Sequence, residues 1–120
     1  MISNVKPDIS FRKGIIEVSA KVATLLGLEN GDIAGFKQDD EELYIYLYEK
    51  ASGRNYKGRC IQCKKNSRFI RIYWKDFCNK VIELDGRAQE AKYRVGDPVK
   101  KGEKTFIPII TRKNYAASGN

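Results

Sequence analysis

The chain has 120 residues, 42% of them hydrophobic and 32% charged, which suits one globular domain over residues 1–120 and excludes an intrinsically disordered protein. No apolar run approaches a membrane span, and the first residues lack the apolar segment of a signal peptide, so we expect a cytoplasmic protein with no membrane partner. The net charge of +8 is uneven, at −3 over residues 1–53 and +11 over residues 54–120. This asymmetry indicates a polyanionic partner for the second half or, equally, a basic surface kept for solubility.

The residue pattern of the first half of the chain predicts four strands, with one short helix between the second and the third. The expected strands, judged from alternating apolar and β-branched residues, are residues 9–11, 14–18, 33–36 and 43–48. Val22, Leu25 and Leu26 form an apolar stripe at helical spacing between the second and third of these strands. Ser19 is a favourable N-cap for that helix and Gly27 a favourable left-handed C-cap.

The second half repeats this kind of pattern after a loop at residues 51–55. The expected strands are residues 56–63, 68–72, 92–95 and 105–111, with a helix over residues 74–84 and a basic turn at residues 99–104. Pro108 predicts that the last strand is an edge strand or contains a bulge, because proline cannot donate to a ladder. Trp74 and Phe77 are expected to pack in the core.

Both halves read as strand, short helix and further strands, which suggests an internal repeat. Residues 9–50 would be the first copy and residues 56–113 a degenerate second copy. The alternative is two unrelated strand–helix–strand pieces of one sheet. The strand from residue 43 to 48 also alternates aliphatic and tyrosine residues. Its tyrosine face is either a half-exposed binding surface or, as is more common, the wetter side of a sheet.

The stretch from Gly14 to Asp32 contains, in order, a glycine, a run of β-favouring residues, a short helix, a Leu-Gly-Leu step and a Gly-Asp step. This stretch resembles the AbrB and MazE (SpoVT-AbrB) family of transcription regulators and antitoxins, and the resemblance covers about residues 9–48. It implies a mainly β fold, the swapped-hairpin AbrB-like β-barrel with two short helices, usually built by a homodimer. If the second half is a degenerate copy, one chain would supply both halves. The resemblance also implies DNA binding in transcription regulation.

The family members that bind DNA usually place arginines after the glycine and inside the short helix, where this chain has Ile15, Ala23 and Thr24. The candidate nucleic-acid-binding residues are therefore the other cations near the motif and in the basic second half: Arg12, Lys13, Lys21, Arg54, Lys57, Arg59, Lys64, Lys65, Arg68, Arg71 and Lys75. Lysine and arginine neutralise phosphates, and Arg68 or Arg71 could read guanine edges. Exposed Tyr56 and Tyr73 beside these cations would suit RNA as another partner.

Enzymatic chemistry has little support in this sequence. The chain has no histidine and no phosphate-cradling glycine loop, so we expect no catalysis and no cofactor. Cys60 and Cys63 have the spacing of half a zinc site, but the chain adds only Cys78, so we expect reduced thiols and no metal. The alternative to DNA binding is a protein-interaction module, antitoxin-like or an assembly partner, that binds an acidic protein and no nucleic acid.

Overall fold

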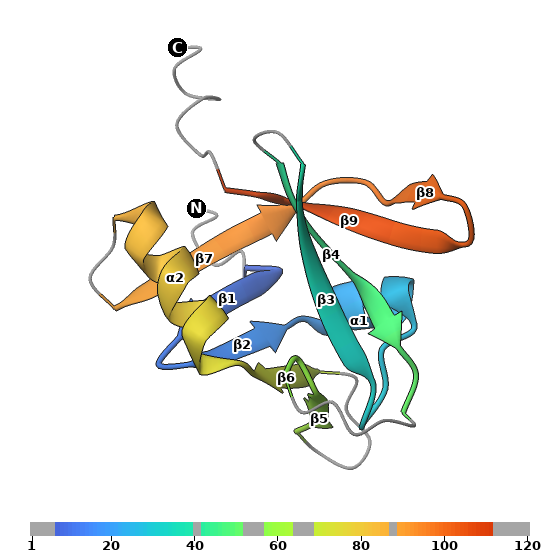
Figure 1. The fold of residues 1–120 in the computed structure, drawn as a ribbon, viewed down its shortest axis with the longest axis horizontal. Coiled ribbons are helices and arrows are strands. Elements are labelled where there is room, and N and C mark those ends of the chain that lie inside the picture. Colours follow the sequence, from blue (N-terminus) through green and yellow to red (C-terminus); the bar gives the residue numbers. More distant parts are fainter. Residues whose placement is uncertain (1–6, 40–41, 52–56, 64–68, 87–88, 112–120) are drawn as a thin grey trace, which may run out of the picture.

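The computed structural model describes residues 7–39, 42–51, 57–63, 69–86 and 89–111, which form nine strands and two helices (Figure 1). The strands are β1 (Ile9–Arg12), β2 (Ile15–Val18), β3 (Ile33–Asp39), β4 (Glu42–Glu49), β5 (Cys60–Gln62), β6 (Ile70–Tyr73), β7 (Glu90–Val95), β8 (Val99–Lys101) and β9 (Lys104–Ile110). The helices are α1 (Ala20–Leu26) and α2 (Lys75–Asp85). The prediction of a mainly β fold with two short helices is confirmed.

The strands form one antiparallel sheet that curls until its ends meet. Its order is β3-β4-β9-β7-β1-β2-β6-β5, and β8 pairs with β9 beside this path. The two end strands join at a seam, where the Ala34 amide donates to the Gly58 carbonyl at 2.8 Å and the Cys60 amide donates to the Asp32 carbonyl at 2.7 Å. These bonds satisfy edge groups of β3 that would otherwise face solvent, so the sheet is barrel-like.

With β8 left aside, the pairing scheme is unchanged when the two halves of the chain are exchanged. Replacing β1, β2, β3 and β4 by β5, β6, β7 and β9 turns the β1–β2 pair into β5–β6 and the β3–β4 pair into β7–β9. The β2–β6 and β4–β9 pairs map onto themselves, and the β1–β7 pair maps onto the seam between β5 and β3. The strand arrangement therefore has an approximate twofold character.

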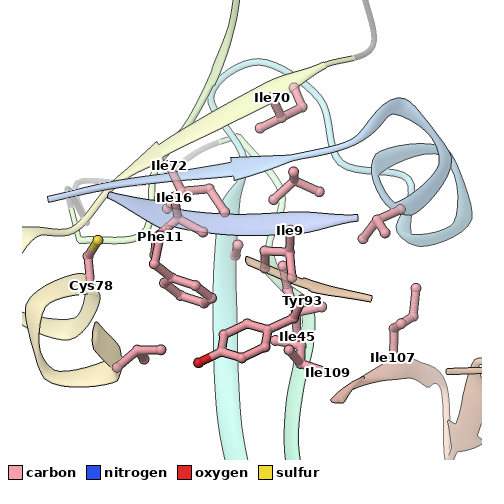
Figure 2. Packing of buried hydrophobic residues seen from close by; sticks show 14 of the residues in the cluster. Ile9, Phe11, Ile16, Ile45, Ile70, Ile72, Cys78, Tyr93, Ile107 and Ile109 are labelled. Atoms are coloured by element: carbon pink, nitrogen blue, oxygen red, sulfur yellow. The ribbon is translucent and has the colours of Figure 1, made fainter. Parts of the chain in front are cut away.

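The core lies inside the curled sheet and consists mainly of branched aliphatic side chains (Figure 2). Alternate residues of β1 point inward and contribute Ile9 and Phe11, and β9 contributes Ile107 and Ile109. The helix α2 packs against β1 and β7 and buries Cys78, Val81 and Ile82. Trp74 and Phe77 pack against this core beside Phe36, as predicted.

The short helix α1 has the predicted caps but a different buried face. The Val22 amide donates to the Ser19 hydroxyl at 3.4 Å, and Gly27 ends the helix in the left-handed region with φ of 74°. Leu25, expected in the apolar stripe, is 45% exposed, whereas Ala23 is buried. In a helix of seven residues, the direction from which the sheet approaches selects the buried face, and here Ala23 faces inward beside Val22.

Pro108 lies in a strand that is paired on both sides, so the expectation of an edge strand is wrong. Tyr44 of β4 pairs with Pro108, and on the other side the Pro108 carbonyl accepts from the Gly96 amide at 2.9 Å. The missing N–H of Pro108 faces that second side, where β9 changes partner between β7 and β8. The expected basic turn at residues 99–104 is shorter than predicted, because Val99–Lys101 form β8 and the turn to β9 lies at residues 102–103.

Candidate nucleic-acid interface

The outer face of β7, β1, β2 and β6 carries a cluster of charged side chains beside the hairpin that joins β1 to β2. Strand register places Lys92, Ser10, Glu17 and Arg71 in one row across the four strands. The next row holds Glu90, Arg12, Ile15 and Tyr73. Because neighbouring side chains on one face of a sheet lie close together, residues from four strands meet on this surface.

A shallow hollow of about 380 Å³ opens on this face. Its lining is mainly polar and charged and consists of Pro7, Ser10, Arg12, Lys13, Ile15, Glu17, Arg71, Glu90 and Lys92. Four cations therefore surround it together with two carboxylates, Glu17 and Glu90. We call this surface the hairpin hollow.

The hairpin that joins β1 to β2 sets the position of Lys13 at the rim of the hollow. Lys13 and Gly14 form a two-residue turn in which both residues have positive φ, 52° and 79°. The left-handed region costs a residue with a side chain about 1 kcal/mol or more, so lysine is an unusual choice here. The Gly14 carbonyl accepts from the Trp74 amide at 3.2 Å, which ties the turn to the start of α2. Lys75, the next residue, lies against Gly14 and adds a fifth cation beside the hairpin.

Ion pairs on this face are exposed and therefore weak. Arg71 Nε donates to Glu17 Oε2 at 2.9 Å, and this hydrogen bond is the main cause that raises the pKa of Arg71, followed by a bond with Tyr73. Glu90 lies 3.1 Å from Lys92 and 3.8 Å from Arg12. Surface pairs of this kind contribute about 0–1 kcal/mol, so an incoming phosphate can compete for these cations at small cost.

The structure brings together part of the predicted set of basic residues. Arg12, Lys13 and Arg71 line the hairpin hollow, and Lys75 lies beside it. Lys21 is exposed on α1 and does not line the hollow, and Lys57 and Arg59 lie at the seam beside β5. Four further candidates, together with Tyr56, fall outside the described residues: Arg54, Lys64, Lys65 and Arg68.

Sequence reasoning missed Lys92, Glu17 and Glu90 as members of this site. The alternation along β7 does indicate that Lys92 faces outward, because its neighbours Ala91 and Tyr93 are buried. What the sequence does not contain is the pairing of β7 with β1, which brings residues about 80 positions apart side by side.

Two of the three cysteines, Cys60 and Cys78, occupy buried environments that disfavour the reactive thiolate. Burial, assisted by the nearby carboxylate of Asp32, raises the pKa of the Cys60 thiol to about 12. Burial also raises the pKa of Cys78, whose sulfur lies 3.5 Å from the Ile15 carbonyl. Cys63 follows the end of β5 and is half-buried. Across the described ranges, cysteines and carboxylates form no group of three or more that could hold a metal ion.

Neither helix of the described chain is long and apolar enough to cross a membrane. Comparison of the whole chain with protein-family models, with curated proteins and with solved structures finds no match.

Proposed function

We propose that this protein binds double-stranded DNA through the hairpin hollow and acts as a transcription regulator. The observation that carries the proposal is the convergence of Arg12, Lys13, Arg71 and Lys92 around one hollow on the outer face of the sheet. A cluster of cations from several strands presents a fixed pattern of positive charge, which suits the regular phosphates of a duplex.

An AbrB-like swapped-hairpin architecture, with both halves supplied by one chain, is part of this proposal. The motif from Gly14 to Asp32 supports it from the sequence side. The approximate twofold character of the strand pairing supports it from the structural side, because β2–β6 and β4–β9 pair across the two halves. In such an arrangement the second half takes the place of a second chain, so no homodimer is needed to complete the sheet.

The cations divide into two roles in this proposal. Lys13 and Lys92, at the rim and on the sheet, neutralise phosphates and so fix the position of the protein on the duplex without reading sequence. Arg71 lies at the end of the row on β6, and its contact with Glu17 at 2.9 Å directs its guanidinium. An oriented arginine is the commonest reader of guanine in the major groove, so Arg71 is the candidate for base recognition.

The test is binding of duplex DNA across a salt series. The variant Lys13→Asn/Lys92→Gln removes two cations of the hollow, and asparagine suits the left-handed turn at position 13. We expect binding of the wild-type protein to weaken steeply with salt, and the variant to lower the slope of log affinity against log salt by about 2.

The control variant Lys21→Gln/Lys100→Gln removes the same charge from two exposed lysines that do not line the hollow. It should keep the wild-type slope. Absence of duplex binding at low salt, or equal losses in both variants, would refute the proposal.

A second candidate function, the protein-interaction module, is favoured by a different surface. Leu84 on α2 is 77% exposed and borders an apolar hollow of about 510 Å³ that is also lined by Phe36, Leu43 and Phe77. Exposed apolar surface of this kind is typical of protein contacts. A protein that fails to bind any duplex but forms a stable complex with an acidic protein, lost in a Leu84→Asp variant, would support this candidate instead.

A further inference from the structure

We propose that a second surface, on the outer side of β4 and β9, binds single-stranded nucleic acid by stacking its bases on tyrosine rings. This tyrosine–lysine face consists of Tyr44, Tyr46, Tyr48, Phe106, Lys37, Lys101 and Lys104. It is separate from the hairpin hollow, and it goes beyond the duplex binding proposed above.

The alternation of β4 produces a row of aromatic rings. Its aliphatic residues Leu43 and Ile45 point into the core, so Tyr44, Tyr46 and Tyr48 all point outward. Residues two apart on a strand are about 6.6 Å from each other. The Tyr46 and Tyr48 ring centroids lie 6.4 Å apart, and Tyr48 is 51% exposed. The strand therefore places three tyrosines at regular backbone steps along an extended path, and the Tyr46 and Tyr48 rings lie edge to face at 73°.

The neighbouring strands support these rings from the sides. Gly35 of β3 pairs with Tyr46, and a Cβ at Gly35 would lie only 2.7 Å from Tyr46 Cζ. The absence of a side chain at Gly35 thus lets the Tyr46 ring lie across the backbone of β3. On the other side, Phe106 of β9 packs against Tyr46 with ring centroids 4.7 Å apart. Tyr46 is consequently held in place before any ligand arrives.

Three lysines stand over the rings of this face. Lys37 Nζ lies 5.6 Å from the Phe106 ring centroid, Lys101 Nζ lies 5.7 Å from that of Tyr44, and Lys104 Nζ lies 5.7 Å from that of Tyr46. A carboxylate of this region, Asp39, lies 3.7 Å from Lys101. Glu42, two residues before Tyr44, is exposed on the same side of β4. The face therefore combines flat rings with positive charge, and its two carboxylates, Asp39 and Glu42, lie together at one end of the tyrosine row.

This chemistry fits a single strand better than the other occupants. A single strand exposes flat bases for stacking and phosphates for lysines, whereas a duplex keeps its bases stacked within the helix. An acidic protein could match the lysines, but it has no regular series of flat π faces to match the tyrosine row.

The two proposed surfaces lie on different parts of the curled sheet. The hairpin hollow lies on β7, β1, β2 and β6, whereas the tyrosine–lysine face lies on β3, β4, β8 and β9. Although β7 adjoins β9, it pairs there through Arg94 and Val95, and no residue belongs to both surfaces. Figure 1 shows β4 and β9 away from β2 and β6. Each surface can therefore be altered without touching the other.

The experiment compares the affinity of the full chain for a labelled oligothymidylate with its affinity for an abasic strand of equal length, by fluorescence anisotropy. Both probes carry the same phosphates, so the ratio of the two affinities reports stacking alone. We expect the wild-type protein to prefer the oligothymidylate by about tenfold or more, the effect of stacking one base. Tyr44→Ala/Tyr48→Ala should bring this ratio close to one, and Tyr44→Phe/Tyr48→Phe should retain it because the rings remain.

Two controls separate this proposal from the others. Tyr73→Ala removes an exposed tyrosine of β6, in the row beside the hairpin hollow, and should leave the ratio unchanged. Lys13→Asn/Lys92→Gln should weaken duplex binding and also leave the ratio unchanged, so duplex binding and single-strand stacking can fail independently. Equal wild-type affinity for both probes would overturn the proposal. So would an alanine variant that keeps the ratio, or one that changes only the oligomeric state in gel filtration, which would make the face a contact between copies.

Discussion

At the scale of single residues, Asp32 shows how one buried carboxylate organises a chain reversal. Its side chain is only 1% exposed. Asp32 accepts hydrogen bonds from the Glu29 and Ala51 amides, each at 2.8 Å, and from Lys50 Nζ at 2.9 Å. The bond to Asp32 is the main cause that raises the pKa of Lys50. The aspartate of the Gly-Asp step therefore has a structural role: it connects the segment after α1 and the end of β4 to the start of β3.

Cys60 gives a prediction about the dependence of stability on pH. Its pKa is raised to about 12 in the folded protein, whereas an exposed thiol ionises near pH 8.5. Between these values the unfolded chain has lost the proton and the folded chain has kept it. The free energy of unfolding therefore falls as pH rises through this window, by up to about 1.4 kcal/mol per pH unit.

The measurement is urea unfolding of wild-type protein and a Cys60→Val variant at pH 8 and pH 10.5. Tyrosines and lysines titrate in both proteins, so the difference between the two isolates Cys60. We expect the wild-type protein to lose more stability than the variant over this range. Parallel losses in the two proteins would contradict the assigned burial of the thiol.

At the scale of elements, the cap of α1 is testable because the helix is short. Seven residues cannot form a stable helix alone, so α1 depends on its packing and on its caps. Ser19→Ala removes the hydroxyl that accepts from the Val22 amide and should lower the free energy of unfolding by about 1 kcal/mol. Ser19→Asp keeps an acceptor and adds a favourable charge at the helix N-terminus, so it should retain stability in chemical denaturation. Equal destabilisation by both changes would mean that packing at Ser19, and not capping, is responsible.

The elements that could be predicted from the sequence are those that depend on a few adjacent residues. The caps Ser19 and Gly27 and the apolar spacing of α2 are properties of a few adjacent residues, and both helices lie where they were expected. The exposed Leu25, the strand β8 and the central position of Pro108 were not predictable in this way. Each depends on which distant strand lies alongside, and residue periodicity carries no information about that.

At the scale of the whole molecule, strand pairing determines the candidate site. Arg12, Lys13 and Arg71 were predictable as isolated basic residues, but their assembly with Lys92 requires β7 to pair with β1 and β6 to pair with β2. These pairings join segments that are more than 50 residues apart. The approximate twofold pairing favours the internal repeat over residues 9–50 and 56–113, which stays a prediction, as does the place of this chain in the AbrB-like family.

The closure of the sheet can be tested at its seam by one glycine. Gly58 has φ of 77°, and a Cβ added there would lie 2.5 Å from the Ala34 carbonyl oxygen, a backbone atom with little freedom to move. Gly102, in the turn between β8 and β9, has φ of 66° and no atom within 4 Å of an added Cβ. Gly102→Ala therefore measures the cost of the left-handed backbone alone, about 1–2 kcal/mol. Gly58→Ala adds a clash that must separate the seam.

We expect the free energy of unfolding to fall further in Gly58→Ala than in Gly102→Ala, by at least about 1 kcal/mol, because the hydrogen bond between the Ala34 amide and the Gly58 carbonyl is strained or lost. Hydrogen exchange should locate the difference, with faster exchange of the Ala34 and Cys60 amides in Gly58→Ala and little change there in Gly102→Ala. If the two variants lose the same stability and protect these amides equally, β3 and β5 do not meet at this seam. The sheet would then be open, and the approximate twofold pairing would lack the β5–β3 pair that corresponds to β1–β7.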